Sequence, residues 1–252
     1  MQNANGIYNL KTNVVLNQDC LAGMKELPDS SIDLILTDPP YELIELTPYF
    51  EQFDRLLKTT GSIYVFGDKN VVAEHWFHQF KMWHKELLIW YYKNSPKPRG
   101  RWRMSMQAII YGYKSAESTW NEDEARIEYQ ASTKKLQGRI RPSYGRYEKA
   151  MAYDVSKGAL ARDVIECPAL TGHLSRERVG HPDQKPLSLF ERLIKTSSNE
   201  GDVVLDSFGG SGTCAFACLN TKRQYIIFEK EKCWCDKIVQ ELEGENWHEI
   251  DK

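Results

Sequence analysis

The amino-acid sequence predicts an α/β fold in which helices cover both faces of a mostly parallel sheet of about seven strands. Three observations support this prediction. Short apolar segments that suit buried strands alternate with segments of helical spacing at both ends of the 252-residue chain. Most connections between these strands are long enough to contain a helix, as parallel neighbours require. Hydrophobic residues make up 41% of the chain, which is enough for a core on each face of such a sheet.

The expected elements follow one another in a regular order. Segments that are short and rich in aliphatic or aromatic residues predict strands at 13–16, 32–36, 62–66, 86–92, 106–113, 203–205 and 224–228. Segments that repeat apolar residues every three or four positions predict helices at 20–26, 48–57, 71–81, 186–197, 213–220 and 231–243. The strands 86–92 and 106–113 are joined by a loop without helical spacing, so we expect an antiparallel hairpin at one edge of the sheet.

Regular periodicity fails between residues 114 and 178. This segment is polar, contains glycine, proline and tyrosine, and has few aliphatic runs. We therefore interpret 1–113 and 179–252 as two parts of one domain, and 114–178 as an insertion between them.

Basic residues concentrate in the middle of a chain whose formal net charge is −2. Residues 93–149 include 13 Lys and Arg residues against 6 Asp and Glu residues. The loop 93–103 contains five of these basic residues and no acidic one. A mildly acidic body with one basic segment favours a polyanion such as nucleic acid as a partner. A solvated, charge-rich loop is the alternative interpretation.

Other classes of protein find little support in the sequence. No stretch approaches the roughly 18 consecutive apolar residues of a membrane-spanning helix, and the first residues lack the basic and apolar parts of a secretory signal. Six irregularly spaced cysteines do not predict a disulfide framework, so we expect a reducing cytoplasm. Cys214, Cys218, Cys233 and Cys235 are the nearest approach to a zinc site. Cys214 and Cys218 fall on one face of a helix expected to pack on the sheet, so we predict buried thiols and no metal site.

The motif Asp38-Pro39-Pro40-Tyr41 follows the predicted strand 32–36, at the edge where open α/β sheets bind ligands. These residues suit a reaction in which the exocyclic amine of a nucleic-acid base is the nucleophile. The Asp38 carboxylate and the Pro39 carbonyl could accept its two N–H groups, because the prolines fix a rigid turn without N–H donors of their own. The Tyr41 ring offers a surface on which a base can stack. The alternative is a plain strand-to-loop turn.

A glycine-rich turn, Gly209-Gly210-Ser211-Gly212, follows the predicted strand 203–205. Residues 210–215 fit the dinucleotide fingerprint G-x-G-x-x-A, which serves NAD and S-adenosylmethionine equally well. Asp206 precedes the turn, where it could meet an ammonium group. Glu229 ends the next strand, where it could accept hydrogen bonds from two ribose hydroxyls. Ordinary capping of strand ends is the alternative for both carboxylates.

A third motif is His181-Pro182-Asp183-Gln184-Lys185-Pro186. Pro186 suits the first turn of a helix, and Lys185 could contact a carboxylate or a phosphate. From these residues alone, a helix-entry turn is the simplest interpretation.

The order of the three motifs resembles the beta group of DNA amino-methyltransferases, over about residues 13–93, 104–113 and 181–240. The resemblance implies a Rossmann-like methyltransferase fold, with 1–113 and 179–252 as the catalytic domain and 114–178 as the target-recognition insertion. It implies S-adenosylmethionine as the cofactor. It also implies double-stranded DNA as the substrate, from which the target base is flipped out.

The same resemblance assigns roles to single residues. It implies catalytic roles for Asp38, Pro39, Pro40 and Tyr41. It implies cofactor contacts for Asp19, Thr37, Asp38, His181, Lys185, Pro186, Asp206, Phe208, Gly209, Gly210, Ser211, Gly212 and Glu229, with Phe66 also lining the pocket. In this group, an aspartate at the first position of the Asp-Pro-Pro-Tyr motif usually accompanies methylation of adenine N6, whereas a serine usually accompanies methylation of cytosine N4. Asp38 therefore favours adenine N6 as the target. A cytosine-N4 methyltransferase and a Rossmann-type NAD oxidoreductase remain as alternatives.

Two basic segments are candidates for DNA contact. The loop 93–103 contributes Lys97, Arg99, Arg101, Trp102 and Arg103, since cations pair with phosphates and arginine also reads guanine edges. A second candidate patch contains Arg139 and Arg141, where an exposed loop is almost as well supported. A homodimer and a cognate restriction endonuclease are further partners that the sequence leaves open.

Overall fold

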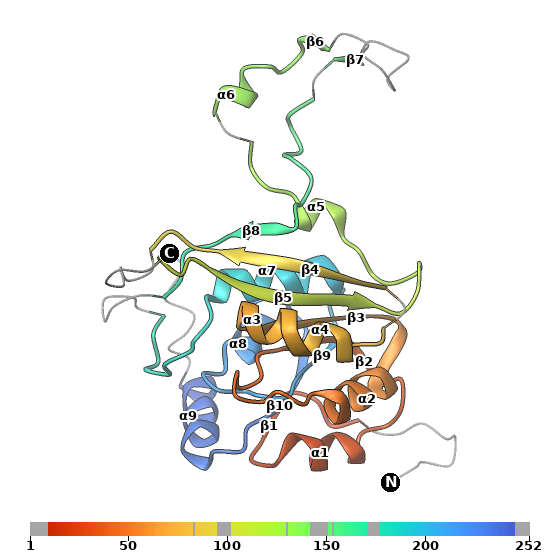
Figure 1. The fold of residues 1–252 in the computed structure, drawn as a ribbon, viewed down its shortest axis with the longest axis vertical. Coiled ribbons are helices and arrows are strands. Elements are labelled where there is room, and N and C mark those ends of the chain that lie inside the picture. The colour runs from red at the N-terminus through yellow and green to blue at the C-terminus, as the bar shows by residue number, and fades with distance from the viewer. Residues whose placement is uncertain are drawn as a thin grey trace.

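The computed structural model describes residues 10–82, 84–94, 102–129, 131–141, 151–152, 154–170 and 177–244. Its centre is an eight-stranded sheet with the order β1-β10-β9-β2-β3-β5-β4-β8 (Figure 1). The strands of this sheet are β1 (Val14–Leu16), β2 (Ile32–Thr37), β3 (Leu57–Gly67), β4 (His84–Tyr91), β5 (Met106–Tyr113), β8 (Val164–Glu166), β9 (Val203–Asp206) and β10 (Gln224–Phe228). The described helical segments are α1 (Cys20–Glu26), α2 (Thr47–Leu56), α3 (Lys69–Val71), η1 (Val72–Trp76), α4 (Phe77–Gln79), α5 (Glu122–Ala125), α6 (Ala131–Lys134), α7 (Leu187–Ser197), α8 (Thr213–Asn220) and α9 (Lys232–Glu243).

The predicted fold class is confirmed. The five strands from β1 to β3 in the sheet order are parallel to their neighbours, and β5 pairs antiparallel with both β3 and β4. The expected hairpin of β4 and β5 is therefore present. It does not form the edge of the sheet, because β8 pairs in parallel with β4 and adds an eighth strand. β8 has only three residues, too few for a periodic pattern, and its pairing partner is what makes it a strand.

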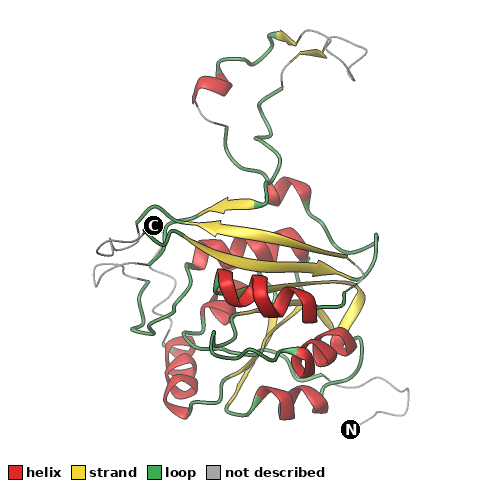
Figure 2. Cartoon of the chain, viewed as in Figure 1, coloured by secondary structure: helices red, strands yellow, loops and turns green. Residues whose placement is uncertain are grey.

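Each face of the sheet carries its own hydrophobic core. Alternate residues of β3 point to opposite faces, so Tyr64 and Phe66 pack with α7 and α8, whereas Ile63 and Val65 pack with α1, α2 and η1. Figure 2 shows the helices as layers on the two sides of the strands. Burying one large apolar side chain of this kind contributes about 1.5–3 kcal/mol, so the two cores fix the sheet and with it the strand ends.

The expected helix 71–81 is present in the pieces α3, η1 and α4, which follow one another without a break from Lys69 to Gln79. The middle piece has π-helical geometry, and it buries Val72 and Trp76 against the sheet. The Trp76 indole N–H donates to the Leu43 carbonyl over 2.7 Å. This bond ties the helical segment to the loop that follows the Asp-Pro-Pro-Tyr motif.

The segment predicted as an insertion is anchored to the main body at both ends. The Asn121 side chain, just before α5, donates to the carbonyls of Lys195 and Ser198 at the end of α7, and β8 joins the sheet. Between these anchors, α6 and the strands β6 (Ile140–Arg141) and β7 (Met151–Ala152) extend away from the sheet as an arm (Figure 1). The assignment of 114–178 to target recognition stays a prediction.

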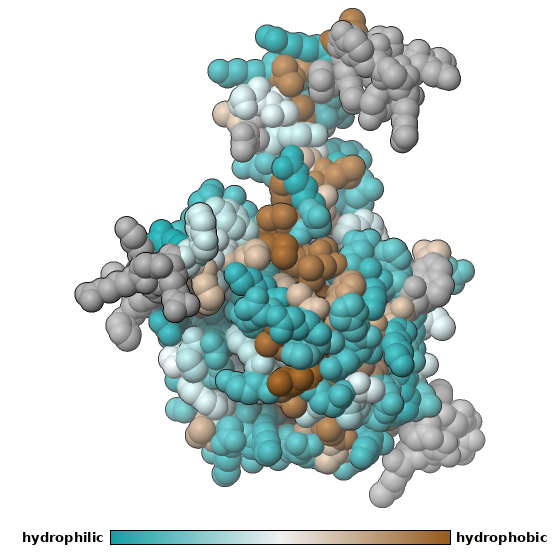
Figure 3. All heavy atoms as spheres, in the orientation of Figure 1, coloured by the Kyte–Doolittle hydropathy of each residue, from teal (hydrophilic) through white to brown (hydrophobic). Residues whose placement is uncertain are grey.

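Apolar side chains gather on the face of the molecule above the sheet edge, where β4 and β8 lie (Figure 3). Leu87 of β4 is 43% exposed and Val164 of β8 is 49% exposed. Across the described ranges of the chain, no helix has both the length and the apolar character needed to cross a membrane.

Candidate active site

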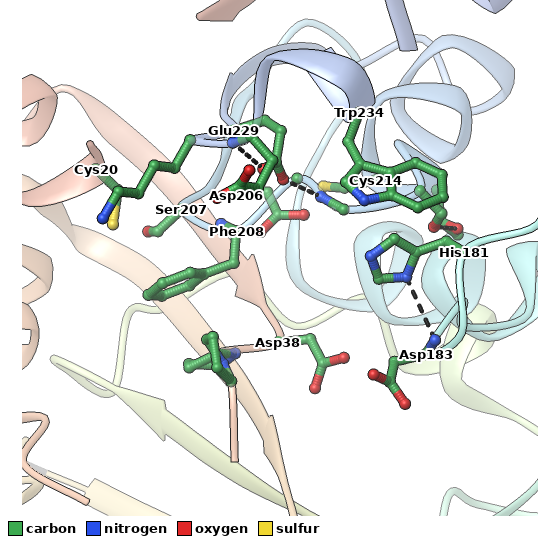
Figure 4. A pocket seen from close by; sticks show the side chains of 18 of the residues that line it. Cys20, Asp38, His181, Asp183, Asp206, Ser207, Phe208, Cys214, Glu229 and Trp234 are labelled. Carbon is green, nitrogen blue, oxygen red and sulfur yellow. Dashed lines mark hydrogen bonds between the residues drawn. The ribbon is translucent and has the colours of Figure 1, made fainter. Parts of the chain in front are cut away.

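The sheet order brings together the strand ends that carry the predicted site residues. β1, β10, β9 and β2 lie side by side and run parallel, so their carboxyl ends meet at one edge. A cleft of about 660 Å³ opens at this edge, within the usual size range of small-molecule sites. Its walls come from residues that follow these strands and from the loop before α7 (Figure 4).

Most of the predicted site residues line this cleft. They are Asp19, Asp38, Pro39, Pro40, Tyr41, His181, Lys185, Asp206, Phe208, Gly209, Gly210, Ser211 and Glu229. Thr37, Phe66, Pro186 and Gly212 are buried and are not among the residues that line the cleft, so their predicted contact with the cofactor stays a prediction. The Asp19 carboxylate caps α1 by accepting the N–H of Ala22 over 3.1 Å.

Thr37 and Asp206 join the strands β2 and β9 at the floor of the cleft. The Thr37 hydroxyl donates to Asp206 Oδ1 over 2.8 Å and accepts the backbone N–H of Ser207 over 3.2 Å. Asp206 Oδ1 also accepts the N–H of Phe208 over 3.0 Å. Burial raises the pKa of Asp206 to about 7, because loss of water disfavours the carboxylate more than these donors favour it.

The glycine-rich turn allows backbone to reach the cleft where a side chain would block it. Gly210 has a φ of +50°, and a Cβ on it would lie 3.3 Å from the His181 ring. Gly212 has a φ of +80° and comes directly before the first residue of α8. Both backbone angles lie in the left-handed region that glycine adopts without strain, so this turn exposes backbone to a ligand.

Glu229 fixes the turn to the end of β10. Its carboxylate accepts the N–H of Gly210 through Oε2 and the N–H of Glu231 through Oε1, each over 2.7 Å. Figure 4 shows these two bonds beside Asp206. Each carboxylate oxygen has a second acceptor position, so Glu229 can hold the turn and accept hydrogen bonds from a ligand.

The Asp-Pro-Pro-Tyr motif lies on the opposite wall of the cleft. β2 ends before Pro39 and Pro40 because neither residue has an N–H to continue the ladder. The Pro40 carbonyl accepts the N–H of Leu43 over 3.0 Å. Among the hydrogen bonds of the described residues, none uses the Pro39 carbonyl, so this acceptor is available to a ligand. The Tyr41 hydroxyl donates to Asp38 Oδ1 over 3.2 Å.

The third motif forms a loop that closes the cleft. Gln184 holds this loop by donating to the Glu177 carbonyl over 2.6 Å and accepting the Val179 N–H over 2.9 Å. His181 packs edge-on against Trp234, with ring centroids 4.6 Å apart, and its burial lowers its pKa. Lys185 forms an ion pair with Asp38, so this loop and the Asp-Pro-Pro-Tyr motif are in direct contact.

Several residues of the site were not among those predicted. Gln107 of β5 donates to the Tyr41 hydroxyl over 2.8 Å, and Cys20, Phe190 and Trp234 line the cleft. A polar residue within an apolar strand is the signal that could have singled out Gln107. The other three belong to segments whose apolar spacing also suits ordinary core packing.

The predicted DNA-contact residues are placed only in part. Trp102 is 97% exposed, and Arg103 and Arg139 are also exposed. Lys97, Arg99 and Arg101 lie outside the described residues, as does the side chain of Arg141, whose backbone forms β6. The exposed Trp102 ring is therefore accessible to a partner.

The predicted burial of Cys214 and Cys218 is confirmed, and both lie in α8. Cys235 is buried and Cys233 is exposed. Within the ranges that the structure describes, no three His, Cys, Asp or Glu side chains are grouped as metal ligands.

A family model described as DNA methylase matches residues 32–241. This range includes the Asp-Pro-Pro-Tyr motif, the third motif and the glycine-rich turn. The chain belongs to the DNA methylase family. The predicted class of enzyme, a DNA methyltransferase, is thereby confirmed.

Two curated proteins illustrate the relatives of this DNA methylase. It is 28% identical to "Type II methyltransferase M.HpaI" of Haemophilus parainfluenzae over 250 residues, which cover 90% of this chain and 73% of the relative. It is also 28% identical to "DNA adenine methyltransferase YhdJ" of Escherichia coli K12 over 235 residues, covering 85% and 77% of the two chains.

Solved structures of other methyltransferases share the fold of this DNA methylase. The complex of M1.HpyAVI with SAM has a TM-score of 0.63 at 24% identity, covering 90% of this chain and 98% of that one. The cytosine-N4-specific PvuII DNA methyltransferase has a TM-score of 0.68 at 16% identity, covering 95% and 90%. At these identities the similarity establishes the fold alone.

Proposed function

We propose that this DNA methylase transfers a methyl group from S-adenosylmethionine to N6 of an adenine in double-stranded DNA. One observation carries the proposal: the carboxylate of Asp38 faces the same cleft as the carboxylates of Asp206 and Glu229 (Figure 4). An acceptor for an amine and a binding site for a cofactor with an ammonium and a ribose therefore occur together. The relative named as a DNA adenine methyltransferase supports adenine as the target.

The residues of the cleft fit S-adenosylmethionine. Buried Asp206 would hold the ammonium of its methionine part, since a cation compensates the cost of an ionised carboxylate in a dry site. Glu229 has acceptor positions for the ribose hydroxyls, and the backbone at Gly209 and Gly210 would allow close approach. When bound, this cofactor supplies an electrophilic methyl group.

The chain's own contribution to the reaction is to orient the amine. Asp38 accepts one N–H of the target amine and the Pro39 carbonyl accepts the other, which favours a tetrahedral nitrogen whose lone pair is available. The Tyr41 ring stacks on the base and fixes its plane. Holding the two reactants in line contributes to the acceleration, because it makes the transfer effectively unimolecular. Asp38 then takes the proton that the nitrogen loses once it carries the methyl group.

DNA would approach from the side of the β4–β5 connection and the arm. The target amine is hidden inside a duplex, so the base must be flipped into the cleft. We assign phosphate contacts to Arg103 and Arg139, together with Lys97, Arg99, Arg101 and Arg141, and base stacking to Trp102. The insertion 114–178 would read the target sequence.

Mass analysis of nucleosides from DNA incubated with the protein and S-adenosylmethionine tests this function directly. We expect N6-methyladenine from the native protein. The Asp38→Ala variant should form at least about 100-fold less while it still binds the cofactor. N4-methylcytosine as the product would favour the cytosine alternative. NADH binding without S-adenosylmethionine binding would favour the oxidoreductase and contradict the proposal.

Further partners belong to the same proposal. Because M.HpaI is named a type II methyltransferase, we include a cognate restriction endonuclease that cuts the unmethylated target. We also include a homodimer, whose interface would cover the exposed apolar side chains of β4 and β8. We expect the protein to act in the cytoplasm. Sedimentation of the protein at several concentrations gives the oligomeric state, and cleavage of target DNA by a co-purified nuclease tests the first partner.

A further inference from the structure

Lys185 lies at the centre of a hydrogen-bond network around the catalytic carboxylate. Its ammonium contacts Asp38 Oδ2, the Tyr41 hydroxyl over 3.1 Å and the Asp183 carbonyl over 3.1 Å. The side chain is only 4% exposed. It comes from the loop before α7, which is 147 residues from Asp38 in the sequence.

These contacts account for every donor of the ammonium. A lysine ammonium has three N–H groups and no acceptor, and each of the three acceptors belongs to the protein. No N–H of Lys185 is left for a cofactor or a phosphate in this arrangement. The resemblance placed Lys185 among the cofactor contacts, whereas its geometry connects it to the base-binding side of the cleft.

The same count of donors and acceptors fixes the direction in which the Tyr41 hydroxyl donates its proton. Lys185 and the Gln107 amide nitrogen can only donate, so the Tyr41 hydroxyl accepts from both. Its one proton is then available only for Asp38 Oδ1. Both oxygens of Asp38 accept hydrogen bonds from the protein, one from Tyr41 and one from Lys185. This pattern suits an ionised Asp38, whose two oxygens act only as acceptors.

We propose that Lys185 is a positioning residue, which keeps Asp38 as a carboxylate and aims it at the target amine. The inference rests on the proposed function. A protonated Asp38 would present an O–H donor to an amine that also donates. The ion pair prevents this, because it supplies a buried positive charge beside a carboxylate that has lost most of its water.

The other charged groups near Asp38 do not replace this lysine. Asp183 raises the pKa of Asp38, and the carboxylates of Asp38 and Asp206 each oppose the ionisation of the other. His181, on the same loop as Lys185, has a pKa lowered by burial, so it is mainly neutral at pH 7. Burial raises the pKa of Asp38, and Lys185 is the largest of the contributions that lower it. Tyr41 contributes a hydrogen bond but no charge.

The test compares Lys185→Met with Lys185→Arg in single-turnover methyl transfer, measured across pH with saturating cofactor and DNA. We expect Lys185→Met to slow transfer on the order of 100-fold at neutral pH. We also expect the acidic limb of its pH–rate profile, the range in which transfer slows as the pH falls, to move up by at least about one pH unit. The affinity for S-adenosylmethionine should stay unchanged. Lys185→Arg should restore the position of the limb because it keeps the charge. Lys232→Met, which removes an exposed ion pair with Asp236, is the matched control and should change neither property.

Two results would overturn the inference. One is a Lys185→Met protein that loses cofactor binding while its acidic limb stays where it is, which would make Lys185 a cofactor ligand. The other result uses the native protein, so it does not depend on a folded variant. If the rate of methyl transfer already falls as the pH is lowered through 7, Lys185 does not keep Asp38 ionised. If the native protein forms no methylated base at all, the proposed function fails instead.

Discussion

The Thr37 hydroxyl donates a hydrogen bond to Oδ1 of Asp206 over 2.8 Å, between the last residues of two parallel neighbouring strands. Both side chains are almost completely buried. The backbone N–H of Ser207 donates back to the same hydroxyl. The Asp-Pro-Pro-Tyr motif begins one residue after Thr37, and the glycine-rich turn begins three residues after Asp206. This contact therefore ties the strand end that carries the Asp-Pro-Pro-Tyr motif to the strand end that carries the glycine-rich turn.

Replacing Thr37 with valine removes the donor and keeps the shape of the side chain. We expect Thr37→Val to lower the free energy of unfolding by about 1–3 kcal/mol, because a buried carboxyl loses a hydrogen bond. Affinity for S-adenosylmethionine should fall about tenfold, a loss of about 1.4 kcal/mol. Urea denaturation and calorimetric titration measure the two effects. Thr60→Val, at an exposed position of β3, is the control, and equal behaviour of the two variants would contradict the role of Thr37.

Cofactor affinity should depend on the ionisation of Asp206. In the cofactor-free protein, burial raises the pKa of Asp206 to about 7. A bound ammonium favours the carboxylate, so below this pKa binding must release a proton. Affinity for S-adenosylmethionine should thus rise about tenfold per pH unit up to about pH 7 and then level off. Titrations in buffers with different heats of ionisation measure the released proton. Asp206→Asn should bind weakly with no such dependence, and a native protein without it would contradict this prediction.

A side chain at Gly210 should disturb the turn in two ways. The backbone φ of Gly210 is +50°, which is unfavourable for alanine. The new Cβ would also lie 3.3 Å from the His181 ring. We expect Gly210→Ala to lower the free energy of unfolding by about 1–2 kcal/mol and to weaken cofactor binding. Gly201→Ala is a matched control, because φ is +88° there and no atom lies within 4 Å of the new Cβ. It should lose similar stability and keep its cofactor affinity, and a loss of affinity there would contradict the assignment.

The exposed Trp102 side chain should contribute to DNA binding and not to cofactor binding. Trp102→Ala should weaken DNA binding about tenfold, since stacking on one base is worth about 1–3 kcal/mol. Arg103→Ala should instead make the slope of log binding constant against log salt concentration less steep by about one, because one phosphate contact is lost. Fluorescence anisotropy at several salt concentrations separates the two effects. Trp120→Ala, at a half-exposed tryptophan beside Tyr111, is the control, and an equal loss there would contradict the assignment of Trp102.

The site could be predicted where its residues directly follow strands. Asp38, Asp206 and Glu229 each come after a short apolar segment, and parallel strands end at one edge of a sheet. The hairpin of β4 and β5 could be predicted for the same kind of reason, because the loop between them has no helical spacing. In contrast, β8 has three residues and becomes a strand only by pairing with β4.

Taken alone, the sequence determined the fold class and the strands whose ends carry the candidate site residues, because periodicity and turn residues report local backbone geometry. The roles of the three motifs stay predictions. Only the tertiary structure decided which side chains meet. Lys185 pairs with Asp38, and Gln107 donates to the Tyr41 hydroxyl, although no local signal gives the partner in either contact. The physical reason is that a buried ion or hydroxyl bonds to the group that the packing of distant segments brings beside it. No short stretch of sequence contains that information.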